Sequence, residues 1–303
     1  MKYKRLMITG GYGFIGSNFI NYLFKKYKNE ISVLNIDSLT YASNQKYINS
    51  EYYNSSRYKH FTRNINDITW YDINKFKPDC IIHFAAESHV DRAIISPEEF
   101  IKTNINGTFN LLELARRNSI RFHQISTDEV YGSLSKDELP FNEYNQIKPS
   151  SPYSASKASA DMLVMAYYKT YNLPVSISRC SNNYGKFQHE EKFIPTVIKS
   201  IIKNEPIPVY GTGANKRDWI HVEDHCRAID LILNSDKSIG QIYNVGAENC
   251  ISNIEVINKI IDIMEHKCYN DVKIKFVTDR LGHDFRYAID NYKIKSELGF
   301  YPK

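Results

Sequence analysis

The sequence has little cysteine and shows no metal-binding or disulfide framework. Its five cysteines, Cys80, Cys180, Cys226, Cys250 and Cys268, are far apart and form no CxxC pair. An odd number of widely spaced cysteines favours free thiols over disulfides or a zinc site. We therefore expect a protein of a reducing compartment such as the cytoplasm, with no bound metal.

Long apolar runs and strong charge of one sign are also absent. No run of about 18 apolar residues occurs, and glycines interrupt the apolar start of the chain, which excludes a transmembrane helix and a signal peptide. The net charge of +5 comes from 39 basic and 34 acidic residues that are scattered along the chain. We therefore expect no membrane and no nucleic-acid partner, although a few of these charges can hold a phosphorylated small molecule.

The remaining composition is that of an ordinary globular protein. The 303 residues are 42% hydrophobic and 24% charged, which indicates about two domains or one large α/β unit. The pattern predicts strands at residues 5–9, 31–37, 79–87, 121–127 and 174–182, and long helices at 98–118 and 153–171. Residues 38–60 are predicted to form a loop or a weak helix. Strands alternating with helices indicate an α/β fold, a Rossmann-like doubly wound parallel sheet.

After about residue 183 the alternation becomes irregular. Short strands at 207–211 and 242–246 are mixed with helices, and Ser252 with Glu255 forms a capping box at a helix start. We therefore expect a nucleotide-binding domain at 1–182. Residues 183–303 mainly form a smaller, mostly C-terminal substrate-binding α/β lobe, interleaved with the first domain.

A glycine-rich loop follows the first predicted strand. Gly10, Gly13 and Gly16 stand between that strand and a helix, where the backbone can approach a pyrophosphate and the helix start can point its N–H groups at it. Asp37 ends the second strand, where a carboxylate accepts both hydroxyls of an adenosine ribose and repels a 2′-phosphate. These features predict NAD rather than NADP as the cofactor.

A tyrosine and a lysine begin the second long helix. Tyr153 and Lys157 are four residues apart and therefore lie on one face of it. A cation at this distance stabilises the phenolate, so that we expect a lowered pKa for Tyr153 and a role for it as a base.

These motifs resemble those of the extended short-chain dehydrogenase/reductase superfamily, and more closely those of nucleotide-sugar 4,6-dehydratases of the dTDP-glucose 4,6-dehydratase type. The resemblance is carried by TGGYGFIGSNF, HFAAESHVDR, STDEVYG, SPYSASKASAD, RCSNNYG, VYGTGANKRDW and DRLGHDFRYAID, which span nearly the whole chain. It implies NAD as a tightly held cofactor, a nucleoside-diphosphate-glucose substrate with dTDP or UDP as the nucleotide, and a homodimer formed through a four-helix bundle.

The resemblance also assigns the chemistry to five residues. Tyr153 takes the proton of the sugar C4 hydroxyl as a hydride leaves C4 for NAD, with Thr127 near O4 and Lys157 on the nicotinamide ribose. Glu129 then removes H5, and Asp128 protonates the departing C6 hydroxyl. Adjacent carboxyls can divide these tasks if their environments separate their pKa values.

Further positions are carried over as binding residues. The cofactor set comprises Gly10, Gly13, Phe14, Ile15, Gly16, Asp37, Asp67, Ile68, Ala85, Ala86, Thr103, Tyr153, Lys157 and Asn183. The substrate set comprises Ser88, Thr127, Asn182, Lys192, Phe193, Pro208, Tyr210, Arg217, Asn253, Arg280 and His283. Around Arg280 and Lys192 the chain departs from the usual family pattern, which leaves the identity of the base open.

Two other functions are compatible with the same motifs. A nucleotide-sugar 4-epimerase would need Tyr153 but neither Asp128 nor Glu129, and such epimerases usually carry small residues there. A catalytically idle NAD-binding regulatory protein would need none of the five catalytic residues. The presence of all five favours the dehydratase.

Overall fold

The centre of the molecule is a seven-stranded sheet in which every strand runs parallel to its neighbours. The computed structural model describes residues 1–265, 272–279 and 284–303. The strand order is β10-β6-β5-β4-β1-β2-β3, and all six pairings are parallel. The strands are β1 (Arg5–Thr9), β2 (Ser32–Asp37), β3 (Tyr58–Thr62), β4 (Cys80–His83), β5 (Arg121–Thr127), β6 (Val175–Cys180) and β10 (Gln241–Val245).

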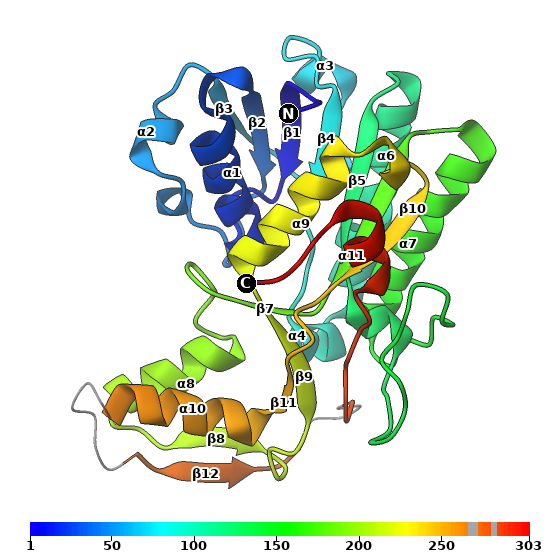
Figure 1. Ribbon diagram of the computed structural model, residues 1–303. Helices are drawn as coiled ribbons and strands as arrows, with labels where there is room; N and C mark the ends of the chain where they lie inside the picture. The colour runs from blue at the N-terminus through cyan, green and yellow to red at the C-terminus, as the bar shows by residue number, and fades with distance from the viewer. Residues whose placement is uncertain (266–271, 280–283) are drawn as a thin grey trace.

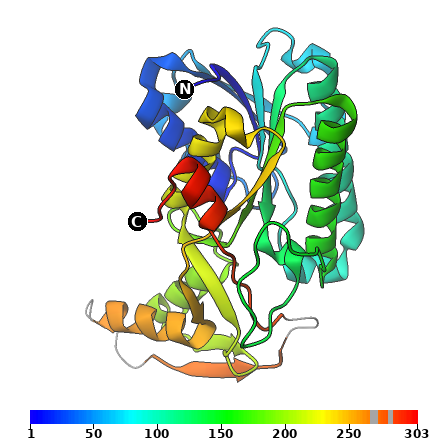
Figure 2. The same cartoon turned by 45° about the vertical axis from the view of Figure 1, so that its right-hand side comes forward.

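Helices cover both faces of this sheet, as Figures 1 and 2 show. On one face, α1 (Phe14–Tyr27) and α9 (Val222–Asn234) share a hydrophobic cluster with β1 and β2. On the other, α6 (Thr108–Arg117) and α7 (Pro152–Tyr171) share a cluster with β4, β5 and β6. Shorter helices are α2 (Ser50–Tyr53), α3 (Trp70–Ile73), α4 (Val90–Ile95), α5 (Pro97–Phe100), α11 (Tyr292–Leu298) and the 3-10 turns η1 (Lys28–Glu30), η2 (Gln45–Tyr47), η3 (Ile65–Asp67), η5 (Asp128–Tyr131) and η6 (Asp236–Ser238).

A smaller lobe lies at the bottom of Figure 1. There α8 (Phe193–Ile202) and α10 (Asn253–Glu265) pack against the parallel pair β8 (Ile207–Tyr210) and β12 (Ile274–Val277). A three-stranded sheet of β7 (Asn182–Tyr184), β9 (Lys216–His221) and β11 (Cys250–Ser252) connects the lobe to the main sheet. The chain returns from this region to the main sheet as α9, β10 and α11.

Several expectations from the sequence are confirmed and others are wrong. The parallel sheet and the capping box at Ser252 are confirmed, since Glu255 Oε2 accepts hydrogen bonds from both Ser252 N and Ser252 Oγ. The strand predicted at 79–87 is shorter, because regular pairing ends at His83. Residues 38–60 were predicted to contain no strand, but β3 begins at Tyr58; it is an edge strand with mostly exposed residues, so it lacks an apolar signature.

The helix predicted at 98–118 is not continuous. A π-helical segment at Ile101–Gly107 separates α5 from α6. Within it, buried Asn104 bonds both backbone groups of Glu87, and its Nδ2 also donates to Ser156 Oγ at 2.9 Å. The extra residue in this turn therefore directs an amide side chain toward the neighbouring loop and helix α7.

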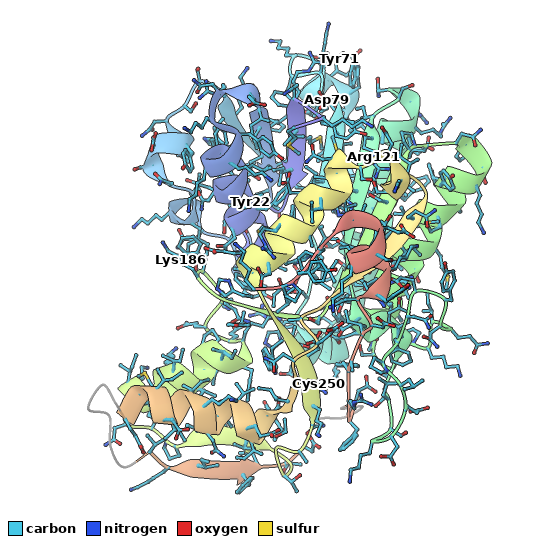
Figure 3. The ribbon with its side chains drawn as sticks, in the orientation of Figure 1. Tyr22, Tyr71, Asp79, Arg121, Lys186 and Cys250 are labelled. Atoms are coloured by element: carbon cyan, nitrogen blue, oxygen red, sulfur yellow. The ribbon has the colours of Figure 1, made fainter. Side chains whose placement is uncertain are left out.

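Parallel pairing brings the carboxyl ends of the strands to one edge of the sheet. Thr9, Asp37, His83 and Thr127 all end strands there. Asp79 and Arg121 mark the opposite edge, at the upper end of the sheet in Figure 3, where Arg121 N donates to Asp79 O at 3.2 Å. In open α/β sheets ligands bind beyond the carboxyl ends, so this edge is where the candidate site must lie.

Candidate active site

The glycine-rich loop forms a turn with no space for side chains. Gly10 has φ +70°, and a Cβ on it would lie 2.6 Å from Ala85 N. A Cβ on Gly16 would lie 2.4 Å from Gly10 O. Helix α1 begins at Phe14 with Gly13 as its N-cap and no side-chain cap, so the first N–H groups of the helix face the loop without a side chain bonded to them. Such a cradle fits a pyrophosphate.

Asp37 is held in a fixed orientation at the end of β2. Its side chain is buried and accepts hydrogen bonds from Tyr12 N at 3.0 Å, Leu39 N at 2.8 Å and Ser43 Oγ at 2.7 Å. A carboxylate offers about four lone-pair sites, so acceptor capacity remains for a ribose hydroxyl. The loop and Asp37 together fit NAD.

The other predicted cofactor residues lie in segments around the same edge of the sheet. Ala85 and Ala86 follow β4, Thr103 lies half-buried in the π-helical segment, and Ile68 is buried after η3 while Asp67 is exposed. Asn183 on β7 has its amide engaged, with Nδ2 donating to Ser181 O and Oδ1 bonded to His225 Nδ1.

Tyr153 and Lys157 lie in the first turns of α7, next to the end of β5. Both are buried, with exposed fractions of 9% and 4%. Ser151 caps this helix, since its hydroxyl accepts a hydrogen bond from Ser154 N. Lys157 Nζ donates to Ile125 O at 2.7 Å, which fixes the ammonium against β5.

The prediction that the pKa of Tyr153 is lowered is wrong when only the protein's own side chains surround the phenol. The pKa of Tyr153 is raised well above its ordinary value, because the phenol is buried and the Glu129 carboxylate lies nearby. A hydrogen bond with Thr127 acts in the opposite direction but is weaker. The charge of Lys157 is directed toward a backbone carbonyl, and burial lowers its own pKa.

Asp128 and Glu129 follow β5 directly, in the 3-10 turn η5. Asp128 is 2% exposed, and its pKa is raised well above the ordinary range by burial, then by the charges of Glu129 and Asp218. Thr127 Oγ1 donates to Asp128 Oδ1 at 3.3 Å, whereas Asp128 Oδ2 is buried without a partner in the described chain. Burial and the neighbouring carboxylates thus favour the protonated form of Asp128, and Glu129 lines the adjoining pocket.

A pocket between the main sheet and the smaller lobe gathers most of the predicted substrate residues. Ser88, Asn182, Lys192, Phe193, Pro208, Tyr210, Arg217 and Asn253 all line it, together with Glu129. Thr127 lies outside this lining, and Arg280 and His283 lie outside the described residues. The pocket thus extends from the turn η5, which carries Asp128 and Glu129, to the smaller lobe.

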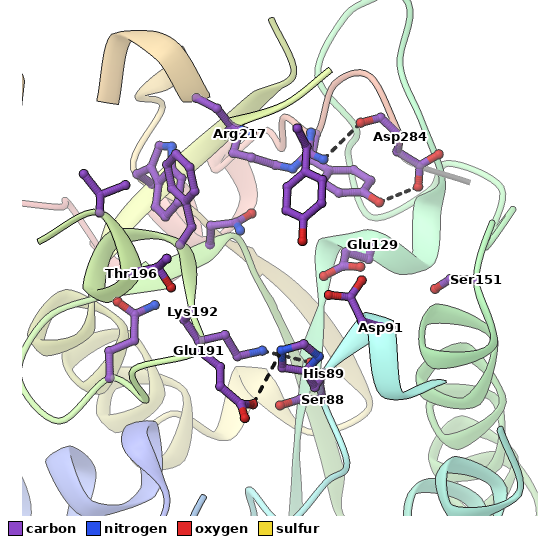
Figure 4. Close-up of a pocket in the computed structure, with 18 of the residues that line it drawn as sticks. Ser88, His89, Asp91, Glu129, Ser151, Glu191, Lys192, Thr196, Arg217 and Asp284 are labelled. Atoms are coloured by element: carbon purple, nitrogen blue, oxygen red, sulfur yellow. Dashed lines mark hydrogen bonds and ion pairs between the residues drawn. The ribbon is translucent and has the colours of Figure 1, made fainter. Parts of the chain in front are cut away.

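Figure 4 shows two cations on opposite sides of this pocket. Lys192 Nζ donates to Ser88 O at 3.0 Å. Arg217 Nη2 donates to Asp284 O at 3.0 Å, and its guanidinium lies 4.3 Å from the centre of the Tyr287 ring. Both side chains are held by neighbouring groups at the wall of the pocket, which suits them to bind the oxygens of a diphosphate.

Other lining residues were not singled out from the sequence. Among them are Asp91, whose carboxylate faces Glu129 in Figure 4, and Trp219, stacked on Phe193 with ring centres 5.9 Å apart. Tyr287 is a third. All three lie in segments that carried the family resemblance, so the signal was present but could not be assigned to single positions.

Two kinds of feature, a metal-binding cluster and a membrane-spanning helix, are absent from the described residues. Across residues 1–265, 272–279 and 284–303, no cluster of His, Cys, Asp and Glu is arranged to hold a metal ion. In the same part of the chain, no helix has the length and apolar character needed to cross a membrane.

Comparison with known proteins gives a consistent result. The family model described as GDP-mannose 4,6 dehydratase matches residues 7–303. A dTDP-glucose 4,6-dehydratase of Haemophilus influenzae is 44% identical, covering 98% of this chain and 93% of the relative. Crystal structures of dTDP-glucose 4,6-dehydratases from Streptomyces venezuelae (40% identity, TM-score 0.92) and Bacillus anthracis (41% identity, TM-score 0.90), both with NAD, each cover 99% of this chain and 92% of the other. The chain therefore belongs to the nucleotide-sugar 4,6-dehydratase family of the extended short-chain dehydrogenase/reductases.

Proposed function

We propose that the protein removes water from dTDP-glucose to give the 4-keto-6-deoxyglucose nucleotide. The observation that carries this proposal is the turn after β5, where a buried Asp128, whose pKa is raised, stands beside Glu129 and close to Tyr153. An epimerase needs only the tyrosine, whereas elimination of water needs an additional acid and base. The activity of the relatives from Haemophilus influenzae and Streptomyces venezuelae supports the same reaction.

NAD is the cofactor, and it supplies reversible oxidation and reduction of the sugar when bound. Gly10, Gly13, Gly16 and Asp37 would hold its pyrophosphate and adenosine ribose, because the glycines let the backbone approach a phosphate and the Asp37 carboxylate bonds Tyr12 N in the same loop. The relatives solved with NAD belong to the same family.

The catalytic residues divide the proton transfers. Tyr153 takes the proton of the C4 hydroxyl, and Thr127 bonds near the same oxygen. The ketone formed at C4 acidifies H5, which Glu129 removes. Burial raises the pKa of Asp128 and so favours its protonated form, which can deliver a proton to the C6 oxygen as water leaves.

The wall of the pocket formed by the smaller lobe would hold the nucleotide end of the substrate. Lys192 and Arg217 pair with the diphosphate, and Asn182 and Asn253 lie beside them. The apolar group of Phe193, Pro208 and Tyr210 would pack on the base. Binding of the remote nucleotide can thus orient the sugar at the catalytic turn.

The test is incubation of the protein with dTDP-glucose and, separately, with UDP-glucose. We expect a 4-keto sugar, detected by its absorbance in alkali, with dTDP-glucose preferred. Interconversion of glucose and galactose without loss of water would instead identify an epimerase. Tight NAD binding without turnover of either sugar would identify a regulatory protein.

We also propose a homodimer formed through α6 and α7. These two helices pack together on one face of the sheet (Figure 2), and several apolar side chains on them and on the segment before them are exposed: Ile95 (81%), Ile101 (52%), Phe109 (50%) and Met162 (58%). Exposed apolar helix faces are commonly covered by a second copy across a two-fold axis. Light scattering would refute the dimer if the mass were near 35.3 kDa at micromolar concentration.

The proposal places this reaction in the cytoplasm, in the biosynthesis of rhamnose or another deoxysugar. The described cysteines Cys80, Cys180, Cys226 and Cys250 are free thiols, which suits a reducing compartment. Fractionation of cells that produce the protein, followed by immunodetection, tests the location.

A further inference from the structure

A buried ion pair lies behind the catalytic residues and makes no part of the pocket wall. Arg179 is on β6 and Asp161 is on α7, and their side chains are 3% and 1% exposed. Arg179 Nε donates to Asp161 Oδ2 at 2.9 Å. Asp161 follows Lys157 by one helical turn and Tyr153 by about two turns. The pair therefore joins strand β6, next to the edge strand β10, to the helix that carries Tyr153 and Lys157.

The same arginine also holds the turn that carries Asp128 and Glu129. Arg179 Nη1 donates to Tyr131 Oη at 2.9 Å, and the guanidinium lies 4.8 Å from the centre of the Tyr131 ring. Tyr131 Oη donates in turn to Asn244 Oδ1 at 2.8 Å, on β10. Tyr131 ends the 3-10 turn η5, two residues after Glu129. We call Arg179, Asp161, Tyr131 and Asn244 the Arg179 network.

A contribution to the stability of the fold does not by itself explain the Arg179 network. Removing two charges from water costs several kcal/mol for each ion, and well-packed apolar residues of similar volume are often as stable or more stable. The turn η5 is in any case anchored by apolar packing, since Val130 and Tyr131 share a buried cluster with Ala158 and Ile289. Apolar packing does not fix the orientation of the turn η5. The planar guanidinium of Arg179 does so, because its hydrogen bonds form at set angles.

The network also affects a catalytic group directly. The negative charge of Asp161 raises the pKa of Lys157 and so opposes the lowering caused by burial. Asp161 thus lies one helical turn after Lys157 on α7 and is paired with the guanidinium of Arg179 on the sheet. The Asp161 carboxylate thus connects Lys157, which the proposal assigns to the oxidation step, with Arg179, which holds the turn η5.

We propose that Arg179 is a positioning residue that fixes the turn bearing Asp128 and Glu129 relative to the helix bearing Tyr153 and Lys157. This inference rests on the proposed dehydratase function, in which oxidation at C4 and elimination across C5 and C6 occur on one bound sugar. The two steps use different segments, so their rates depend on how the segments are aligned. Misplacement of a reacting group by about 1 Å can cost about 10²-fold in rate.

The test uses two variants of the network and one matched control. Tyr131→Phe removes one hydroxyl and keeps the ring, and Arg179→Lys keeps the charge but loses the planar fork. The control is Tyr243→Phe on β10, where a buried tyrosine loses its hydroxyl bond to Glu297 Oε2 (2.7 Å); Tyr243 precedes Asn244, but neighbouring side chains of a strand point to opposite faces of the sheet. Each variant is assayed with NAD bound, using dTDP-glucose.

We expect kcat to fall about tenfold to 10²-fold in both network variants while KM changes less than about twofold. Reduced nicotinamide should accumulate during turnover, because elimination lags behind oxidation. The control should lose thermal stability to a similar extent and keep its kcat. A kcat within about twofold of the parent in Tyr131→Phe, or a loss without accumulation of reduced nicotinamide, would overturn the proposal; Tyr131→Phe decides the matter even if Arg179→Lys does not fold.

Amide hydrogen exchange provides a readout that does not depend on the substrate. Exchange at residues 127–132 should accelerate in Tyr131→Phe and Arg179→Lys relative to the amides of β5, and should stay unchanged in Tyr243→Phe. Unchanged exchange in the network variants would contradict the positioning role. If the parent protein does not dehydrate dTDP-glucose, the proposed function fails, while the exchange result still decides whether Arg179 orders the turn.

Discussion

Replacing Asp128 by asparagine removes the proposed acid while keeping the volume of the side chain. Asp128 is buried, and its pKa is raised well above the ordinary range by burial and by Glu129. Both effects favour the neutral carboxylic acid form of the native side chain. An amide resembles it in size and in charge but cannot give up a proton to a leaving group.

The structure separates the expected effects on rate and on stability. Loss of one acid–base group lowers kcat by about 10²–10⁴-fold, or about 2.7–5.4 kcal/mol in the activation barrier. The hydrogen bond from Thr127 Oγ1 to Asp128 Oδ1 is 3.3 Å long, and one such bond contributes about 0.5–1.5 kcal/mol. Asp128→Asn should therefore abolish most activity and change the free energy of unfolding near pH 4 by no more than about 1.5 kcal/mol.

The pH dependence gives a second, independent signature. The unfolded chain loses the Asp128 proton near pH 3.9, whereas the folded protein keeps it to a higher pH. The folded state then binds more protons, so the stability of the parent falls as pH rises above about 4, by at most about 1.4 kcal/mol per unit, until the folded-state pKa is reached. The stability of Asp128→Asn should not fall in this way. Its free energy of unfolding should therefore rise progressively relative to that of the parent as the pH increases from about 4 to the folded-state pKa.

Urea unfolding of both proteins between about pH 4 and pH 8, combined with assays of dTDP-glucose turnover, measures these quantities. A stability difference that is constant across this range would show that Asp128 is ionised in the folded protein. A kcat within about tenfold of the parent would show that another group protonates the leaving oxygen. Either result would refute the assignment of Asp128 as the neutral acid.

Three further predictions concern other parts of the site. Glu129→Gln should stop dehydration yet still allow substrate to reduce the bound cofactor, since oxidation uses Tyr153; a cofactor that stays oxidised in stopped-flow absorbance would contradict this division. Tyr153→Phe should lose at least about 10²-fold in turnover and show no reduction of the cofactor, and residual activity above about one per cent would exclude the phenol as the base. Gly10→Ala would place a Cβ 2.6 Å from Ala85 N at φ +70°, so we expect weaker NAD binding by titration and a lower Tm; unchanged binding would show that the loop can rearrange.

Some features could be predicted because they depend on residues close together in the chain. The glycine loop, Asp37 after β2 and the spacing of Tyr153 and Lys157 all follow from local geometry. The alternation of apolar segments with helices likewise predicted the parallel sheet, because strands that are buried on both faces are continuously apolar in sequence. The missed strands β3 and β12 carry exposed residues and lack that signature.

Other features depend on burial and on contacts between distant segments. The spacing of Tyr153 and Lys157 predicted a lowered tyrosine pKa, but burial and the carboxylate of Glu129 raise it, and Lys157 is directed to Ile125 O. At the interruption of the helix before α6, Asn104 bonds the backbone of Glu87 in a loop that is distant in sequence. Neither effect has a local sequence pattern, because each is set by what the folded chain places nearby.

The sequence by itself therefore determined the family and predicted the glycine-rich loop and the candidate reacting groups, since each is encoded in a short motif. Only the tertiary structure decided how those groups are held and charged. Tyr131, Asp161, Arg179 and Asn244 come from four separate elements and meet because parallel pairing aligns β5, β6 and β10 beneath α7. Burial at that junction, which no residue spacing reveals, raises the pKa of Asp128 beside Glu129.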